Sequence, residues 1–497
     1  GVLFGVYDFI EKVLGVRWYF PPGDLGTVIP HKKDIIITKT NYSDAPAFQL
    51  RTGGLYSYGY TYWQWHPITR AGATTDLFVN HTMATWGPVF GKTHPEYFSI
   101  RSDGTRNINY KGYYHPDSHI CYSNPGVLKQ HIENVKIWNK DHSNGILFGC
   151  RPPSDKYVYL AAADVMEVHG ICHCKNCLKK WHPENPPWPS GQFSDLIFGY
   201  AKKLAAALKK NHLPQQRVAV LAYAGYERAP DDMKWPDNVD VCLAEIKSPA
   251  IQVDPRVYTS ERKNILKWSK LVKGKRERLT MWHYFCYPND FCSAPMPAPH
   301  VMAKWFKDYV NVISGLFANR GAKKTFLMAW LWHKLLWNPY ADVDKLLDEF
   351  YRNMYGPAYK PMKALFQLEI NRWENTRWSE VPLKGYVPER LVYEESYPPE
   401  IVAKLKQYIE KAKELTPPES IYRKRVQWQI ERHKPFFEES KLWTYWKHRW
   451  VHVVFERVKN QDNLWWKNKK AYELKEQMYG KEPKFKTKVF FGHTGKD

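Results

Sequence analysis

The strongest constraint on the fold is an alternation of short apolar runs with helical stretches between residues 47 and 320. The runs with the length and residue types of buried strands are 48–51, 145–148, 157–163, 218–222, 239–243, 279–282 and 313–317. The clearest helix between them spans 194–210, with Ser194 expected as its N-cap. Because strands that alternate with helices form parallel sheets, we predict an α/β protein with a TIM-like (β/α)8 barrel, one strand of which is not recognised. An open doubly wound sheet competes, but no Gly-rich phosphate loop supports it.

The two flanks of this region have different patterns. Residues 1–45 contain a helix, a Pro/Gly turn and an apolar run at 34–38 that predicts a strand, which together resemble the end of an N-terminal α/β domain. We expect further residues to precede them, because the chain starts inside a helical pattern. Helical periodicity then dominates the segments 326–336, 343–355, 360–376, 399–415 and 420–450. The predicted parts are therefore 1–45, a catalytic barrel at 46–325, and an all-α domain at 326–497.

The composition limits the classes of ligand that this chain is expected to bind. Aromatic residues make up 16% of the chain, with 22 Trp and 33 Tyr, which suits stacking on sugars or bases but also suits a bulky core. Lys and Arg (73) exceed Asp and Glu (50), and the formal charge of +23 favours a polyanion such as an acidic polysaccharide or nucleic acid. No apolar run is long enough to cross a bilayer.

The basic, Trp-rich segment at 441–488 has the composition of a surface that binds single-stranded nucleic acid. No motif of a known nucleic-acid-binding module accompanies it. We therefore predict an amphipathic helix with a solvated basic face, and we disfavour nucleic acid as the partner.

Carboxylates follow two of the predicted strands. Asp164 and Glu167 come after the run 157–163, and Glu245 comes after 239–243. Residues just beyond the carboxyl ends of barrel strands line the active-site face, where an unpaired carboxylate is costly to desolvate. We predict these three as catalytic, with Glu167 or Glu245 as general acid and Asp164 orienting substrate or stabilising charge. The alternative is that Asp164 caps a following helix and Glu167 is solvated.

Rings and cations near the predicted strand ends are candidates for binding substrate. They are Arg51, His81, His94, Tyr223, Trp282, His283 and Tyr284. Aromatic faces suit stacking on a pyranose, imidazoles can bond to hydroxyl groups, and a guanidinium pairs with carboxylate or sulfate. Core packing, structural histidines and an internal ion pair of Arg51 are the competing interpretations.

A cysteine cluster follows the predicted acids. Cys172, Cys174 and Cys177 form a CxCxxC motif, and Cys121 is a candidate fourth ligand for a structural zinc ion. Two disulfides, which a secreted protein would favour, and free thiols are the alternatives, although Cys172 and Cys174 are poorly spaced to pair with each other. None of these interpretations requires a cofactor for catalysis.

Several phrases occur in the order found in one family: DAPAFQLR, FGKTHPEYFSIRSDGTR, HICYSNPGV, CHCKNC, AYAGYERAP, WHY and LLWNPYADVDKLLDEFYRNMYGPA. The chain resembles the domain-of-unknown-function 4838 family, part of which is classed as glycoside hydrolase family 163, endo-β-N-acetylglucosaminidases that act on complex N-glycans. The resemblance implies a glycoside hydrolase that acts on a polysaccharide or glycoprotein glycan outside the cytoplasm, in the periplasm, at the cell surface or secreted.

Two positions depart from the family pattern. The family carries Asn-Asp at the strand end where this chain has Ala163-Asp164, followed by a longer spacer. Where the family has an acidic or amide residue after Gly-x-Phe, this chain has Ala318-Asn319-Arg320. Two functions are therefore predicted: hydrolysis of a complex, anionic or N-acetylated glycan, or non-catalytic glycan binding by a surface-matrix protein on a hydrolase-like barrel.

Overall fold

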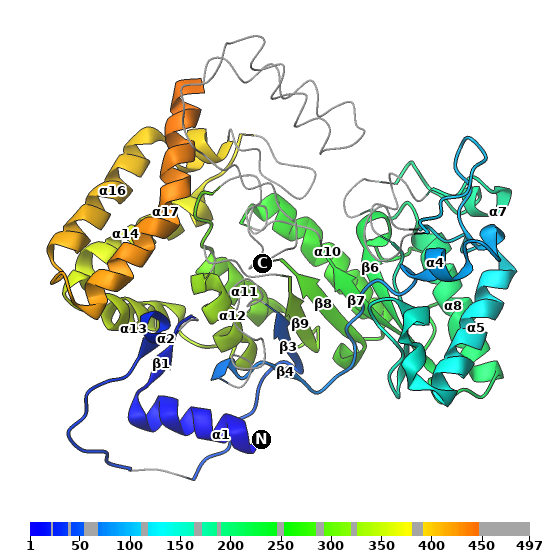
Figure 1. The fold of residues 1–497 in the computed structure, drawn as a ribbon, viewed down its shortest axis with the longest axis horizontal. Coiled ribbons are helices and arrows are strands. Elements are labelled where there is room, and N and C mark those ends of the chain that lie inside the picture. The colour runs from blue at the N-terminus through cyan, green and yellow to red at the C-terminus, as the bar shows by residue number, and fades with distance from the viewer. Residues whose placement is uncertain are drawn as a thin grey trace.

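The computed structural model describes residues 1–20, 23–37, 41–53, 68–110, 118–163, 171–185, 190–245, 253–284, 293–319, 326–379 and 391–446 (Figure 1). A seven-stranded sheet in the order β4-β3-β9-β8-β7-β6-β5 forms its centre. The strands are β3 (Leu50–Gly53), β4 (Gly72–Ala73), β5 (Tyr157–Leu160), β6 (Arg217–Tyr223), β7 (Val239–Ala244), β8 (Leu279–His283) and β9 (Gly315–Ala318). Every neighbouring pair is parallel except β3 and β4.

The prediction of a (β/α)8 barrel is confirmed in part: the protein is α/β, and its sheet is a curled half-barrel. Within the described residues, the sheet starts at β4 and ends at β5 without a ladder that would close it. The strand predicted at 145–148 is wrong, because these residues lie in the 3-10 helix η4 (His142–Phe148). The Asp141 side chain accepts from Ser143 N at the start of this turn, and Ile146 remains 61% exposed while Phe148 is buried, so the run does not form the predicted, continuously buried strand.

The two faces of the sheet bury different sets of side chains. One set, including Val220 and Leu243, joins the large core shared with the helices. The other face is concave and packs against Leu77 and Val79 from the segment that follows β4. Thr280 Oγ1 donates to Leu77 O at 2.6 Å, so this segment is bonded to the sheet it covers. In the described part of the chain, an irregular segment thus fills the concave side.

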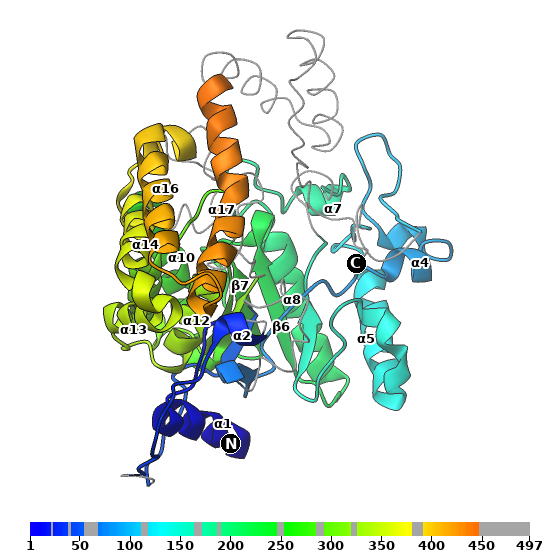
Figure 2. The ribbon, with the colours of Figure 1, turned by 60° about the vertical axis from the view of Figure 1, so that its left-hand side comes forward.

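Helices cover the outer face of the sheet. They include α5 (Pro125–Lys140), α8 (Ser194–Lys210), α10 (Pro255–Leu271) and α11 (Pro299–Tyr309), with α5 and α8 side by side (Figure 2). The bounds predicted for α8 are confirmed, but the predicted cap is wrong. Phe193 occupies the N-cap position, and Ser194 Oγ instead donates to Arg228 O at 2.8 Å, which ties the helix to the loop after β6.

The predicted helical periodicity after residue 325 is confirmed. The helices are α12 (Phe326–Trp337), α13 (Val343–Tyr355), α14 (Tyr359–Asn375), α16 (Pro399–Glu414) and α17 (Ile421–Trp446). Helix α16 packs between α14 and α17 at one side of the molecule (Figures 1 and 2). Most of the basic, Trp-rich segment at 441–488 lies outside the described residues. None of the described helices is long and apolar enough to cross a membrane.

Ion pairs attach the N-terminal helical segment to the rest of the protein. Helix α1 (Val2–Phe9) continues into the π-helix η1 (Ile10–Leu14), where Glu11 accepts from Arg70 at 2.6 Å and pairs with Lys334 of α12. The strand predicted at 34–38 is wrong where the structure describes it. Residues 34–37 have no regular structure, and Ile36 is 78% exposed because this run packs against no partner.

A buried ion cluster joins four strands at their amino ends. Asp240, whose side chain is 1% exposed, accepts from Arg278 Nε at 2.7 Å and from Arg217 Nε at 2.8 Å. The Tyr157 hydroxyl donates to the same carboxylate at 2.7 Å. These residues belong to β5, β6, β7 and the turn before β8, so one carboxylate holds the bottom of the half-barrel together.

Asp240→Ala should lower the free energy of unfolding by about 3–5 kcal/mol, because it leaves two guanidinium groups near a buried site without their shared partner. Asp237→Ala is the matched control. Asp237 pairs with Lys273 at 2.7 Å but is 72% exposed, and its loss should cost about 0–1 kcal/mol. Denaturant titration of both variants measures the difference, and equal losses would contradict the role given to Asp240.

His300 joins three helices through a second ionic contact. Its Nδ1 lies 2.7 Å from a Glu374 oxygen on α14, and its Nε2 lies 3.2 Å from Asp344 on α13. The hydrogen bond to Glu374 raises the pKa of His300 from 6.5 to about 9, against the effect of burial.

The stabilisation from protonated His300 should be complete below pH 6.5 and should fade as the pH rises through about 9, because the folded state then loses the proton that holds both carboxylates. Melting temperatures of the wild type and His300→Gln, measured from pH 6 to pH 10, test this. The gap between the two proteins should shrink toward high pH. A gap that stays constant over this range would show that the contact does not depend on the charge of His300.

Candidate functional site

The carboxyl ends of the parallel strands meet at one edge of the sheet. Tyr223, the last residue of β6, pairs with Ala244 of β7, and Ala244 pairs with Trp282 of β8. Trp282 in turn pairs with Phe317 of β9. Residues that follow these strands therefore share one edge, as the sequence predicted for the candidate site.

Of the three carboxylates predicted to be catalytic, Glu245 is the one within the described residues. It follows β7 directly and is 0% exposed. Burial raises the pKa of the Tyr309 hydroxyl, and the nearby charges of Glu261 and Glu245 raise it further. Glu245 thus lies close to Tyr309 of α11, on the side of the sheet that carries the helices. The other two predicted acids, Asp164 and Glu167, lie outside the described residues.

His283 belongs to a buried cluster on the same side. Its Nε2 lies 3.8 Å from an oxygen of Glu261 on α10, and its ring meets Trp305 edge-on at 4.7 Å. Trp305 Nε1 donates to Glu261 at 3.2 Å. His283 and Glu261 are 0% and 1% exposed, so this predicted substrate ligand is enclosed between the sheet and its helices.

Glu227 is a buried carboxylate that sequence reasoning did not select. It follows the 3-10 helix η5 (Ala224–Tyr226) at the end of β6 and is 0% exposed. Its backbone is fixed on both sides, since its N–H donates to Ala224 O at 3.2 Å and its carbonyl accepts from Trp268 Nε1 at 2.9 Å. The signal in the sequence is an acid shortly after a predicted strand end, within the quoted phrase AYAGYERAP.

The concave side of the edge is aromatic. Trp282 stacks on Phe78 with ring centroids 5.3 Å apart and meets Phe317 edge-on at 4.6 Å. Tyr223 and Trp282 are half-buried and pack against the concave core, and Tyr284 is buried. The structure therefore brings three of the predicted rings to one end of the half-barrel, with two of them partly accessible.

The other predicted ligands are dispersed. Arg51 is 3% exposed and donates to Phe48 O at 2.7 Å and to Arg70 O at 3.2 Å. Burial lowers the pKa of Arg51 to about 10. Because its N–H groups already donate to backbone carbonyls, Arg51 has a structural role. His94 bonds to Glu96 at 3.1 Å and stacks on Tyr97, away from the strand ends.

His81, unlike Arg51 and His94, lies near the carboxyl edge of the sheet. Its Nδ1 lies 3.4 Å from Ala162 O, just beyond β5. Its backbone carbonyl accepts from Cys150 N at 2.9 Å, which fixes the loop that carries it. His81 therefore lies next to the described residues just past β5.

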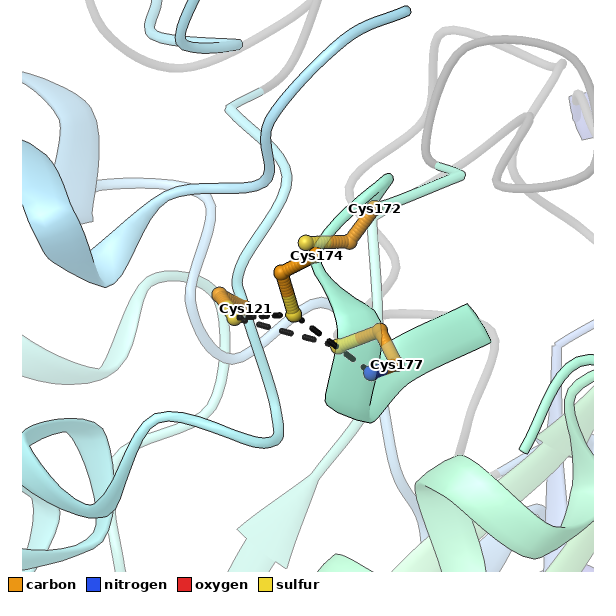
Figure 3. A group of neighbouring side chains, drawn as sticks. All are labelled: Cys121, Cys172, Cys174 and Cys177. Atoms are coloured by element: carbon orange, nitrogen blue, oxygen red, sulfur yellow. Dashed lines mark hydrogen bonds between the residues drawn. The ribbon is translucent and has the colours of Figure 1, made fainter. Parts of the chain in front are cut away.

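The four predicted cysteine ligands come together (Figure 3). All four sulfurs lie within 4.8 Å of one another, and Cys121 Sγ is 3.7 Å from Cys174 Sγ and 3.8 Å from Cys177 Sγ. Three of these side chains are buried and Cys174 is half-buried, and all four are free thiols. A hydrogen bond with Cys121 lowers the pKa of the Cys172 thiol, and the same contact raises the pKa of Cys121.

Comparisons with known proteins place the chain in a family. No curated protein sequence matches it. Among solved structures it is similar to a family 89 glycoside hydrolase from Clostridium perfringens in complex with 2-acetamido-1,2-dideoxynojirmycin, at TM-score 0.41 and 11% identity over 82% of this chain and 51% of that chain. The same hydrolase in complex with PUGNAc gives TM-score 0.36 and 11% identity over 82% and 52%. The chain thus spans about half the length of these structures. The family model described as Domain of unknown function (DUF4838) matches residues 22–366, and the chain therefore belongs to this family.

Proposed function

We propose that the chain is a glycoside hydrolase whose active site lies at the carboxyl edge of the half-barrel. The observation that carries the proposal is Glu245, a carboxylate with 0% exposure at the first position beyond a central parallel strand. Glu227 supplies a second fully buried carboxylate at the end of the neighbouring strand. Both lie past the carboxyl ends of parallel strands, the edge where barrel enzymes hold their catalytic residues.

Glycoside hydrolysis requires an acid that protonates the leaving oxygen and a group that stabilises the oxocarbenium-like centre. The acid must hold a proton within hydrogen-bond reach of the leaving oxygen. We assign Glu245 or Glu167 as the acid, and Asp164 as the group that orients substrate or stabilises charge. Tyr223 and Trp282 offer ring faces at the same edge for stacking on a sugar.

The proposed substrate is a complex, anionic or N-acetylated glycan of a polysaccharide or glycoprotein. The formal charge of +23 attracts polyanions, and the family resemblance implies N-acetylglucosamine linkages. An extracytoplasmic location fits such a substrate.

Mass spectrometry after digestion of sulfated, uronate-rich and N-acetylated glycans should detect released oligosaccharides. Glu245→Gln, Glu167→Gln and Asp164→Asn are the test variants. Loss of the general acid should slow release about 10²–10⁴-fold. The acid variant should keep most of its activity on an aryl glycoside with an acidic phenol, because such a leaving group needs no proton.

Glu277→Gln is the matched control for these variants. Glu277 is exposed in η6 (Arg276–Arg278), directly before β8 and therefore at the opposite edge of the sheet. Its rate of glycan release should equal that of the wild type. Wild-type rates in all three test variants would contradict the proposed site.

A second candidate is non-catalytic glycan binding on a hydrolase-like scaffold. The cluster of Glu261, His283 and Trp305 favours it, because these side chains serve packing beneath the helices next to Glu245. Binding that weakens steeply with salt, without release of any product, would support this function over hydrolysis.

A further inference from the structure

Two separate loops present the four cysteines. Cys121 lies just before α5, Cys172 and Cys174 precede the short helix α7 (Lys175–Leu178), and Cys177 lies within that helix. The residues 97–100 bond to both loops: Cys121 N donates to Tyr97 O at 2.8 Å, and His173 N donates to Ile100 O at 2.8 Å. The backbone therefore holds the sulfurs together through contacts that do not involve them.

The sulfur separations fit a single central ion. Zinc–thiolate bonds of about 2.3 Å in a tetrahedron place neighbouring sulfurs about 3.8 Å apart. Cys121 Sγ lies 3.7 Å from Cys174 Sγ and 3.8 Å from Cys177 Sγ, and the whole set lies within 4.8 Å (Figure 3). A group this compact has room for one ion and none for an iron–sulfur cluster, whose inorganic atoms would hold the cysteine sulfurs farther apart.

The same distances argue against disulfides. Cys121 is equally close to two other sulfurs, as expected for ligands of a common centre and not for one half of a covalent pair. A bridge between Cys121 and Cys177 would leave Cys172 to pair with Cys174, from which it is separated by one residue only.

The surroundings suit thiolates. Ile100 N donates to Cys172 Sγ at 3.5 Å, and Cys177 N donates to Cys174 Sγ at 3.4 Å. Backbone donors of this kind stabilise metal-bound sulfur and fix its orientation. The stretch from Ile171 to Trp181 contains lysines and no carboxylate, so its charge opposes that of a tetrathiolate site.

We propose that Cys121, Cys172, Cys174 and Cys177 bind one structural zinc ion. Four sulfur ligands complete the tetrahedron and leave no open position, so the ion stabilises the fold and does not take part in catalysis. It joins the loop before α5 to the loop after β5. In the sequence, this ligand set begins eight residues after Asp164 and five residues after Glu167.

Metal analysis of the purified full chain tests the proposal independently of any enzymatic activity. Elemental mass spectrometry should find about one zinc per chain after dialysis without reductant. Replacement by Co²⁺ should produce the intense thiolate-to-cobalt absorption of a tetrahedral sulfur site. A strong zinc chelator should lower the melting temperature, since metal binding contributes to folding.

Cys172→Ser and Cys177→Ser should lose most of the bound zinc. Cys150→Ser is the matched control, because Cys150 is a partly buried cysteine outside the cluster, and this variant should keep the metal. Less than about a tenth of an equivalent of zinc in the wild-type chain would overturn the proposal. Iron in place of zinc, or a disulfide between any two of the four cysteines in peptide mapping, would also overturn it. The wild-type measurement decides the matter even if the serine variants fail to fold.

Discussion

The buried carboxylate of Asp240 is the interaction on which the half-barrel depends. It receives hydrogen bonds from Arg217, Arg278 and Tyr157, so the amino ends of four neighbouring strands share one charge cluster. A charge in this position is tolerated only because each partner is held in place by the strand that carries it. The residues at the amino edge of the sheet therefore stabilise the fold. The carboxyl edge carries the buried carboxylates Glu227 and Glu245 and the half-buried rings of Tyr223 and Trp282.

Strand geometry explains why adjacent residues at that edge have different environments. Side chains along a strand point alternately to the two faces of the sheet. Trp282 therefore joins the aromatic group on the concave side, while its neighbour His283 contacts Glu261 and Trp305 beneath the helices. Ala244 and Glu245 divide in the same way, with Ala244 in the concave core and Glu245 near Tyr309.

The cysteine cluster is close in the sequence to the end of β5. Backbone bonds attach residues 172–177 and the segment around Cys121 to residues 97–100. Fixing chain segments in this way costs conformational entropy, which an anchor can offset. A metal ion that binds only the folded arrangement supplies such an anchor through the free energy of binding.

The sequence by itself determined the strands β5 to β9, the helices after residue 325 and the family, because each is encoded in local periodicity or in ordered phrases. It also indicated the CxCxxC motif and its candidate partner, Cys121. Only the tertiary structure decided that the run 145–148 forms a helical turn, that residues 76–79 fill the concave face, and that Glu227 is fully buried. It also showed that Arg51 serves the backbone and that Trp282 and His283 lie on opposite faces. The reason is that periodicity reports which residues avoid water, whereas the face, the partner and the closure of a sheet depend on contacts between segments far apart in the chain.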